Sequence, residues 1–176
     1  MIGLKRGIVK LLPYNPKWQV AFEKEKKFLL KELYGLVLNI EHIGSTSIPG
    51  IVAKPIIDML MAVSSLEDVS ELRNKLEKIG YEYRENGSDD IQILFVKGPE
   101  EKRTYYLHIT ELNSIEWQNS IGFRNYLRKN PERAKQYSDL KSELAVKYSH
   151  DRAKYSANKA NFVRETIELA QNYKTL

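Results

Sequence analysis

The chain has 176 residues, of which 42% are hydrophobic and 29% charged, with no cysteine and a formal net charge of +5. This balance is typical of one globular domain and excludes a disordered chain. The lack of cysteine excludes disulfides, thiol nucleophiles and cysteine-based zinc sites. No apolar run is long enough to span a membrane, and the first residues lack the apolar core of a signal peptide, so we expect a cytoplasmic protein.

The positive charge is concentrated in the last third of the chain. Residues 1–113 contain 16 Lys and Arg against 16 Asp and Glu, whereas residues 114–176 contain 12 against 7. A polyanionic partner would therefore contact the C-terminal third. This small excess of positive charge favours a solvated helical surface over a binding surface for long nucleic acid. A phosphorylated small molecule remains compatible with it, because such a ligand needs only a few of these cations.

The first half of the chain predicts strands and helices in alternation. Residues 7–14 predict a strand or an extended arm, and Asn15 with Pro16 predicts a helix start. That helix should end at Gly35, and its apolar stripe is Trp18, Phe22, Leu29, Leu30 and Leu33. Residues 36–43 and 56–63 predict two strands, the second buried on both faces. Another helix is expected from Ser65 to Gly80.

The second half predicts a hairpin followed by helices. Residues 81–85 alternate weakly, and residues 91–97 and 104–111 predict two antiparallel strands. Asn113 with Glu116 resembles a capping box, Asn130–Pro131 predicts another helix start, and a last helix is expected from about Asp151 to Tyr173. We therefore predict one α/β domain with a mixed sheet, in which residues 1–112 form the core and residues 113–176 form helices packed on it.

A glycine and three hydroxyl side chains follow the first predicted strand. They are Gly44, Ser45, Thr46 and Ser47. A glycine at a strand end allows close approach of a ligand to backbone N–H groups, and hydroxyls add donors for phosphate oxygens. The segment matches neither a Walker loop nor a dinucleotide fingerprint. Taken alone, it is equally typical of a turn with a helix cap.

A lone carboxylate, Asp58, interrupts the apolar strand that follows. A charged carboxylate there would lose several kcal/mol of solvation unless it had a partner or faced a cleft. Lys54 or an arginine of the C-terminal helices would be the partner in a structural ion pair. Alternatively, Asp58 is a ligand for Mg²⁺ beside the anion-binding segment, because Mg²⁺ prefers carboxylates together with substrate phosphates. The glycine and hydroxyls upstream favour this second interpretation.

The last predicted helix carries cations and aromatics on one face. Arg152, Tyr155, Lys159 and Phe162 follow at three- and four-residue spacing. If the aromatics face the core, the cations are drawn toward an anion such as Asp58 or a bound triphosphate, although each alone could also reach solvent. His108 lies on a predicted strand, where histidines are usually structural, and would serve as an acid or base if it reached the cleft.

Several segments together resemble the GrpB family of bacterial proteins, also designated UPF0157, which belongs to the nucleotidyltransferase superfamily. They are LPYNPKW at 12–18, IEHIGSTSIPGIVAKPIID at 40–58, YLHIT at 106–110 and FRNYLRKNPERAKQY at 123–137, with the spaced residues Arg152, Tyr155, Lys159 and Phe162. The resemblance implies a nucleotidyltransferase-like mixed sheet with packed helices. It also implies that Gly44 and Ser45 are the superfamily's Gly-Ser motif and that Asp58 is its first strand aspartate.

The resemblance fails at the second metal-binding acid. The superfamily places it two residues after the first, where this chain has Leu60. A third carboxylate is also absent from the expected later strand, and Glu41 and Glu111 are the nearest substitutes. Two-metal catalysis needs several oxygen ligands, so a single aspartate argues against that mechanism and leaves single-metal or metal-free nucleotide binding.

Three hypotheses follow from the sequence. In the first, a nucleotidyltransferase-like protein binds a nucleoside triphosphate at Gly44–Ser47, with Asp58 holding Mg²⁺ and with Lys54, Arg152 and Lys159 neutralising phosphate charge. In the second, favoured by Leu60, a non-enzymatic module binds a nucleotide or another phosphorylated ligand. In the third, the basic C-terminal third binds RNA, with an affinity that falls steeply with salt.

Overall fold

A computed structural model describes residues 2–67 and 69–173 of the chain. Its centre is a five-stranded sheet in the order β1-β2-β5-β4-β3. The strands are β1 (Asn39–Ile43), β2 (Ile57–Val63), β3 (Tyr81–Tyr83), β4 (Ile93–Lys97) and β5 (Tyr105–Glu111). Only β2 and β5 pair in parallel, whereas β4 and β5 form the expected antiparallel hairpin. The predicted mixed sheet is therefore confirmed.

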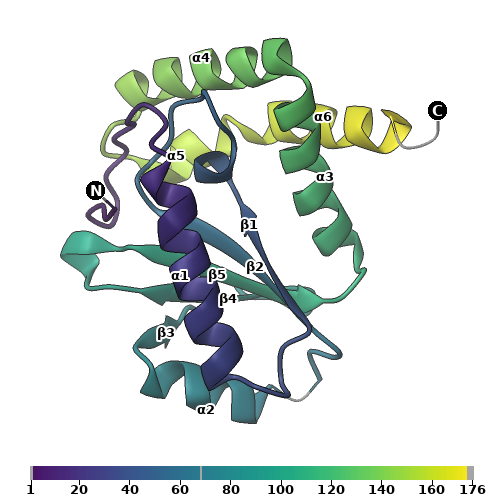
Figure 1. Cartoon of the computed structure of the whole chain (residues 1–176). Helices are drawn as coiled ribbons and strands as arrows, with labels where there is room; N and C mark the ends of the chain where they lie inside the picture. The colour runs from purple at the N-terminus through teal and green to yellow at the C-terminus, as the bar shows by residue number, and fades with distance from the viewer. Residues whose placement is uncertain (1, 68, 174–176) are drawn as a thin grey trace.

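Two helices cover one face of the sheet. They are α1 (Lys17–Glu32), which lies across the sheet, and α2 (Ser70–Lys78), which lies at its lower edge (Figure 1). The Asn15 side chain accepts a hydrogen bond from the Lys17 N–H at 2.9 Å, as the helix-start signal predicts. Trp18, Phe22 and Leu29 are buried against the inner residues of β2 and β5. Leu30 is exposed, which corrects its place in the predicted stripe.

The C-terminal helices gather on the opposite face (Figure 1). They are α3 (Ile115–Lys129), α4 (Pro131–Lys147), α5 (Arg152–Ala157) and α6 (Ala160–Tyr173). Trp117 of α3 packs on Ile43 of β1 and on Leu60 of β2. Successive residues of β2 point to opposite faces, so Met59 belongs to the core under α1, whereas Asp58 and Leu60 point toward the C-terminal helices.

Several predicted boundaries are wrong. The cap of α3 is Ser114, whose side chain accepts from the Trp117 N–H at 3.2 Å, and not Asn113, which adopts a φ of +64°. Helix α2 begins at Ser70, later than the expected Ser65. Residues 7–14, by contrast, form one of the two expected alternatives, an extended arm with an isolated bridge between Leu12 and Ala53.

The predicted last helix is two helices. Helix α5 ends at Ala157, and α6 begins at Ala160, with Asn158 and Lys159 between them. Phe162 therefore does not continue the face of α5, and it stacks on Tyr137 of α4 with 5.3 Å between ring centroids. The break separates the two halves of the predicted cation and aromatic stripe. It sends Phe162 to the core between α4 and α6, away from Tyr155.

Candidate functional site

The Gly44–Ser47 segment makes a sharp turn at the end of β1. Gly44 has a φ of +66°, and the next three residues form the short 3₁₀ helix η1 (Ser45–Ser47). A Cβ atom at Gly44 would lie 2.4 Å from Asp58 Oδ2, a distance that no real side chain tolerates. Position 44 therefore requires glycine for two reasons: the backbone has a positive φ, and the Asp58 carboxylate leaves no space for a side chain.

Helix α3 holds this segment in place. Arg128 donates two hydrogen bonds to the Ser47 carbonyl, from Nε at 2.9 Å and from Nη2 at 2.7 Å. Arg124 donates to the His42 carbonyl at 2.9 Å and to Glu41 Oε2 at 2.6 Å. Because planar guanidinium groups fix the geometry of what they bind, these contacts order the backbone on both sides of Gly44.

His42 supports the same segment from the opposite side. Its Nδ1 lies 3.0 Å from Gln19 Oε1, and its Nε2 lies 3.0 Å from Thr46 Oγ1. The His42 ring stacks on the Phe22 ring, with 4.7 Å between the ring centroids. Burial, together with the positive charges of Arg128 and Arg124, lowers the pKa of His42 to about 3. His42 is therefore neutral, with Nδ1 as the donor to Gln19 and Nε2 as the acceptor from Thr46.

A cavity of about 260 Å³, here called the Asp58 cavity, opens beside this turn. Its walls come from η1, β2, β4, β5 and the C-terminal helices. The lining residues are Gly44, Ser45, Thr46, Lys54, Asp58, Leu94, Tyr106, His108, Tyr137, Arg152, Tyr155 and Lys159. Nine of the ten predicted site residues thus lie around one cavity, and Ser47 is the exception; the nine are Gly44, Ser45, Thr46, Lys54, Asp58, His108, Arg152, Tyr155 and Lys159. Whether they bind a ligand there stays a prediction.

Ser47 has a structural part in the turn. Its hydroxyl donates to the Gly44 carbonyl at 2.6 Å, and its side chain is buried. This bond closes the turn from within and leaves the neighbouring residues Ser45 and Thr46 to line the cavity. Ser47 therefore shapes the proposed binding segment without facing it.

Asp58 is surrounded by positive charge without a direct ion pair. Among the described residues it forms none of the salt bridges, yet Lys54 and Lys159 are close enough for their charges to interact with it. The pKa of each lysine is lowered to about 8, mainly by burial; the charge of Arg152 also lowers both values, whereas Asp58 raises them. The predicted structural ion pair of Asp58 is therefore absent from the described chain, and cations outnumber the carboxylate in the cavity.

A further lysine lies behind the cavity. Lys141 of α4 is only 1% exposed, donates to the Val52 carbonyl and lies 4.5 Å from the centroid of the Tyr137 ring. Burial, followed by repulsion from Lys159 and Lys54, lowers its pKa to about 6. Lys141 is therefore neutral at pH 7, and it becomes protonated more readily when an anion enters the cavity.

Aromatic rings separate these cations from one another. The Lys54 and Lys159 ammonium groups lie 5.6 and 4.3 Å from the centroid of the Tyr155 ring. Arg152 Nη1 donates to the Tyr106 hydroxyl at 2.6 Å. Cations held against aromatic faces keep their positions without a carboxylate partner, so they remain available to an anionic ligand.

His108 lines the cavity beside Asp58 and points from β5 toward the C-terminal helices. Burial lowers its pKa, and the positive charge of Arg152 lowers it further, whereas Asp58 raises it. At neutral pH the ring is uncharged and able to accept a proton or a hydrogen bond. Its placement is consistent with the predicted acid–base role, which the structure leaves a prediction.

The second-acid position is closed to metal ions. Leu60 is fully buried beneath Trp117, in a small apolar cluster on the same face of β2 as Asp58. Glu41 is paired with Arg124, and Glu111, at the far end of β5, accepts from the Leu66 N–H at 3.0 Å. Within the described residues, no group of three His, Asp or Glu side chains could hold a metal ion. The nearest substitutes for the missing acids are thus engaged elsewhere.

Sequence reasoning missed two tyrosines in the cavity wall. Tyr137 lies among Lys141, Phe123 and Phe162, and burial raises its pKa to about 12. Tyr106 is the partner of Arg152. Tyr137 follows the apolar spacing of α4 and Tyr106 lies in an apolar strand, so the sequence pattern did not mark either one as a site residue. Their hydroxyl groups were the one signal that a polar cavity lay beside them.

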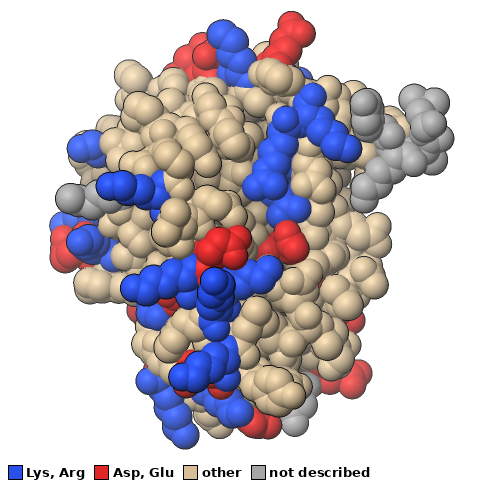
Figure 2. All heavy atoms as spheres, viewed as in Figure 1, with Lys and Arg blue, Asp and Glu red and all other residues tan. Residues whose placement is uncertain are grey.

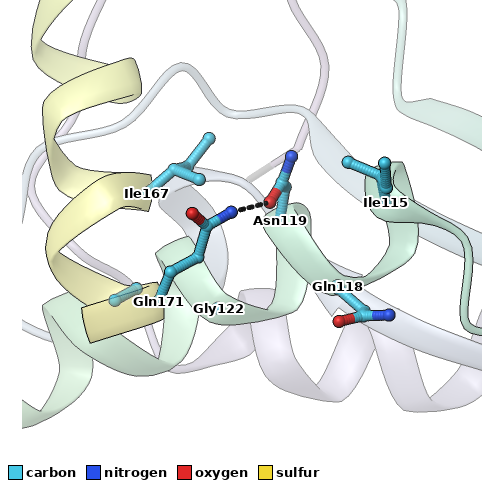
Figure 3. A pocket seen from close by; sticks show the side chains of 7 residues that line it. Ile115, Gln118, Asn119, Gly122, Ile167 and Gln171 are labelled. Atoms are coloured by element: carbon cyan, nitrogen blue, oxygen red, sulfur yellow. Dashed lines mark hydrogen bonds between the residues drawn. The ribbon is translucent and has the colours of Figure 1, made fainter. Parts of the chain in front are cut away.

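Another hollow lies between α3 and α6, and its chemistry is different (Figure 3). It measures about 230 Å³ and is lined by Ile115, Gln118, Asn119, Gly122, Ile167, Ala170 and Gln171. Gln171 donates to Asn119 Oδ1 across it at 3.0 Å. Without an ionisable group in its wall, this hollow does not suit the phosphate chemistry of the Asp58 cavity.

Comparison with known proteins identifies the family. The model of the "GrpB protein" family matches residues 8–169. The glutamate-rich protein GrpB of Alkalihalophilus pseudofirmus is 37% identical over 171 residues, which cover 95% of this chain and 98% of that protein. The crystal structure of conserved protein GrpB from Enterococcus faecalis has a TM-score of 0.87 at 37% identity and covers 95% of this chain and 100% of that chain.

A more distant structure supports the fold. The Cid1 poly(U) polymerase bound to MgGTP has a TM-score of 0.50 at 13% identity, covering 76% of this chain and 44% of that chain. At this identity the likeness concerns the fold alone, and it agrees with the nucleotidyltransferase-like sheet that the sequence predicts. The family match spans nearly the whole chain and includes both the Gly44–Ser47 turn and Asp58. The chain is a member of the GrpB family.

Proposed function

We propose that this protein binds a nucleoside triphosphate through the Asp58 cavity. In this proposal the phosphates lie against the backbone and hydroxyls of Gly44, Ser45 and Thr46, and Lys54, Lys159 and Arg152 neutralise their charge. The observation that carries the proposal is the convergence of these three cations on a glycine-containing turn, around one carboxylate with no ion pair in the described chain. Such an arrangement favours an anionic ligand that spans the positive groups.

The dimensions of the cavity support binding of the phosphates and not of the whole nucleotide. Pockets that enclose drug-sized ligands measure roughly 300–1,000 Å³, and the Asp58 cavity is about 260 Å³. The base and ribose would therefore extend beyond the cavity. This geometry favours recognition of phosphate over recognition of one particular base.

The residues present fit Mg²⁺ only as part of a metal–phosphate complex. Asp58 is the one carboxylate of the cavity, and Lys54 and Lys159 would repel a cation that arrived alone. Mg²⁺ is commonly bound through one or two carboxylates together with substrate phosphates. We infer that the ion enters with the triphosphate and that Asp58 supplies the protein's carboxylate oxygen to it.

The buried Leu60 favours a second candidate function, a binding module without nucleotidyl transfer. Two-metal transfer needs carboxylates that hold ions about 3.5–4 Å apart, and Leu60 occupies the position of the second acid in an apolar cluster. RNA binding through the C-terminal third has less support, because residues 114–176 contain only 12 Lys and Arg against 7 Asp and Glu. On the α1 side of the molecule, which is the face drawn in Figure 2, Lys and Arg side chains form separate groups with Asp and Glu among them.

Thermal unfolding with each nucleoside triphosphate, with and without Mg²⁺, tests the proposal. A ligand at about 100 times its Kd should raise the Tm by about 5–10 °C for a domain of this size. Asp58→Asn should bind metal-free triphosphate more tightly, because a repelling charge is removed, and should lose the additional stabilisation by Mg²⁺. Asp139→Asn, which removes an exposed carboxylate paired with Lys135, is the matched control.

Absence of any shift in the wild type, or an Mg²⁺ response that Asp58→Asn leaves unchanged, would contradict the proposal. Release of pyrophosphate then distinguishes the two candidate functions. A transferase releases pyrophosphate when a triphosphate and a suitable acceptor are supplied together. A binding module releases no pyrophosphate with any acceptor in the assay.

A further inference from the structure

A second cavity adjoins the Asp58 cavity and has a different wall. It measures about 440 Å³ and shares Leu94, Tyr106 and Arg152 with the Asp58 cavity. The rest of its lining comes from the N-terminal segment, the turn after β3, strand β4, the residues before β5 and helix α5. These residues are Arg6, Gly7, Arg84, Asn86, Val96, Arg103, Ala153 and Ser156.

All charged residues in this wall are arginines. They are Arg6, Arg84, Arg103 and Arg152, and we call the cavity that they line the arginine groove. No carboxylate is among its lining residues. Guanidinium groups present forked N–H donors that match phosphate and carboxylate oxygens, so four of them around one cavity favour an anionic ligand with more than one oxygen.

Carboxylates outside the wall orient three of these arginines. Glu82 accepts from Arg84 at 2.8 Å and from Arg103 at 2.7 Å, and Glu100 is paired with Arg6 and lies 3.8 Å from Arg103. The Arg103 side chain is only 4% exposed and also donates to the Gly98 carbonyl at 2.7 Å. The bonds between Glu82 and these two arginines also lower the pKa of Glu82. The groove is therefore held in position before any ligand binds.

Arg152 differs from the other three arginines. It forms no salt bridge within the described chain, and its Nη1 donates to the Tyr106 hydroxyl at 2.6 Å. Both side chains line both cavities. Arg152 thus lies where the Asp58 cavity and the arginine groove meet, and its positive charge attracts an anion in either cavity.

We propose that the arginine groove is a second anion subsite, which binds a phosphorylated small molecule separate from the triphosphate. Arg84 and Arg6 bind its phosphate, Arg103 supplies buried positive charge, and Arg152 contacts both ligands. One part of this proposal rests on the proposed function, namely that the second ligand is the acceptor of a transferred group. The existence of the subsite does not, because its wall binds anions whether or not the Asp58 cavity is filled.

Titration calorimetry with inorganic pyrophosphate tests the subsite. The wild type should bind two pyrophosphates. Arg84→Gln and Arg6→Gln should each weaken one binding event, by about tenfold or more for loss of a charge-assisted hydrogen bond. Lys54→Gln should weaken only the other event, and Arg152→Gln should weaken both. Arg73→Gln is the matched control, because Arg73 also pairs with a glutamate but lies on α2.

The outcomes separate the subsite from the proposed function. Loss of one event in Arg84→Gln with no effect of Lys54→Gln supports the groove and contradicts binding in the Asp58 cavity. A single event that both substitutions weaken contradicts the second subsite, because one ligand then spans both cavities. Two events that Arg84→Gln and Arg6→Gln leave unchanged also contradict it.

Discussion

At the scale of single residues, the close contact between Gly44 and Asp58 determines the shape of the candidate site. Gly44 follows β1 and Asp58 lies in β2, and position 44 has no room for a side chain because the Asp58 carboxylate occupies that space. The strand end and the lone acid were detectable in the sequence because both interrupt an apolar pattern. Their contact was not, since it depends on the register of β1 against β2, where Ile43 lies opposite Asp58.

Gly44→Ala should destabilise the protein more than a similar substitution in open space. Gly44 combines a φ of +66° with a ψ of −175°, a region that residues with a side chain adopt only at a cost of about 1–3 kcal/mol, and the contact with Asp58 adds to that cost. Gly35→Ala is the matched control, because Gly35 has a φ of +83° and would meet no atom within 4 Å. Urea unfolding should give a larger loss for Gly44→Ala. Equal losses for the two variants would show that the Asp58 contact carries no penalty.

His42 should make stability depend on pH. Its folded pKa of about 3 lies below the ordinary value of 6.5, so protonation favours the unfolded chain. The stabilisation is complete above pH 6.5 and is lost as the pH falls from 6.5 toward 3, at up to about 1.4 kcal/mol per pH unit. The difference in unfolding free energy between wild type and His42→Gln should therefore shrink from pH 7 to pH 4. A constant difference would contradict a buried neutral His42.

At the scale of elements, helix α3 supports the Gly44–Ser47 turn. Its apolar face and the approximate extent of α4 could be predicted from period and cap signals, whereas its cap is Ser114 and not the predicted Asn113. The contacts of Arg124 and Arg128 with the backbone around Gly44 could not, because helical charges are usually solvated. The division between α5 and α6 was also missed, since Asn158 and Lys159 fit a continuous helical period.

Arg128→Gln should loosen the turn. The substitution removes two charge-assisted hydrogen bonds to the Ser47 carbonyl, each typically contributing about 1.5–3 kcal/mol. Hydrogen exchange at the Ser47 and Ile48 amides, which close η1, should accelerate by about tenfold or more. Lys129→Gln, on the same helix and exposed, should leave both rates unchanged. Unchanged rates in Arg128→Gln would show that α3 is not the support.

A carboxylate at position 60 of β2, where the superfamily has its second acid, should destabilise the fold. Leu60→Asp places a charge beneath Trp117 and should destabilise the protein by more than about 3 kcal/mol, whereas Leu60→Met should cost less than about 1.5 kcal/mol. Chemical unfolding measures both variants. A stable Leu60→Asp protein with Mg²⁺-dependent pyrophosphate release would show that the position is a vacant metal site and not part of the core.

At the scale of the whole molecule, the two faces of the sheet differ in what they pack against. The face of the sheet under α1 and α2 holds the large apolar core, whereas the opposite face leaves two cavities between the strands and the C-terminal helices. Among the described residues, no helix is long and apolar enough to cross a membrane. The Asp58 cavity was predictable from its polar interruptions. The arginine groove was not, because its four arginines come from distant segments.

The central claim is that anionic phosphates bind among the lysines of the Asp58 cavity. Because Lys54 and Lys159 have pKa values of about 8, a bound anion should raise both values and draw protons from solution. The affinity should therefore fall as the pH rises from 7 to 9, as the free lysines lose their charge.

Titration calorimetry at pH 8 with a nucleoside triphosphate, in two buffers of different ionisation enthalpy, measures that proton uptake directly. The wild type should take up protons on binding. The Lys54→Met and Lys159→Met double variant should bind more weakly and take up fewer protons, whereas Lys24→Met, on the exposed face of α1, should match the wild type. Binding without proton uptake, or uptake that the double variant retains in full, would contradict the claim.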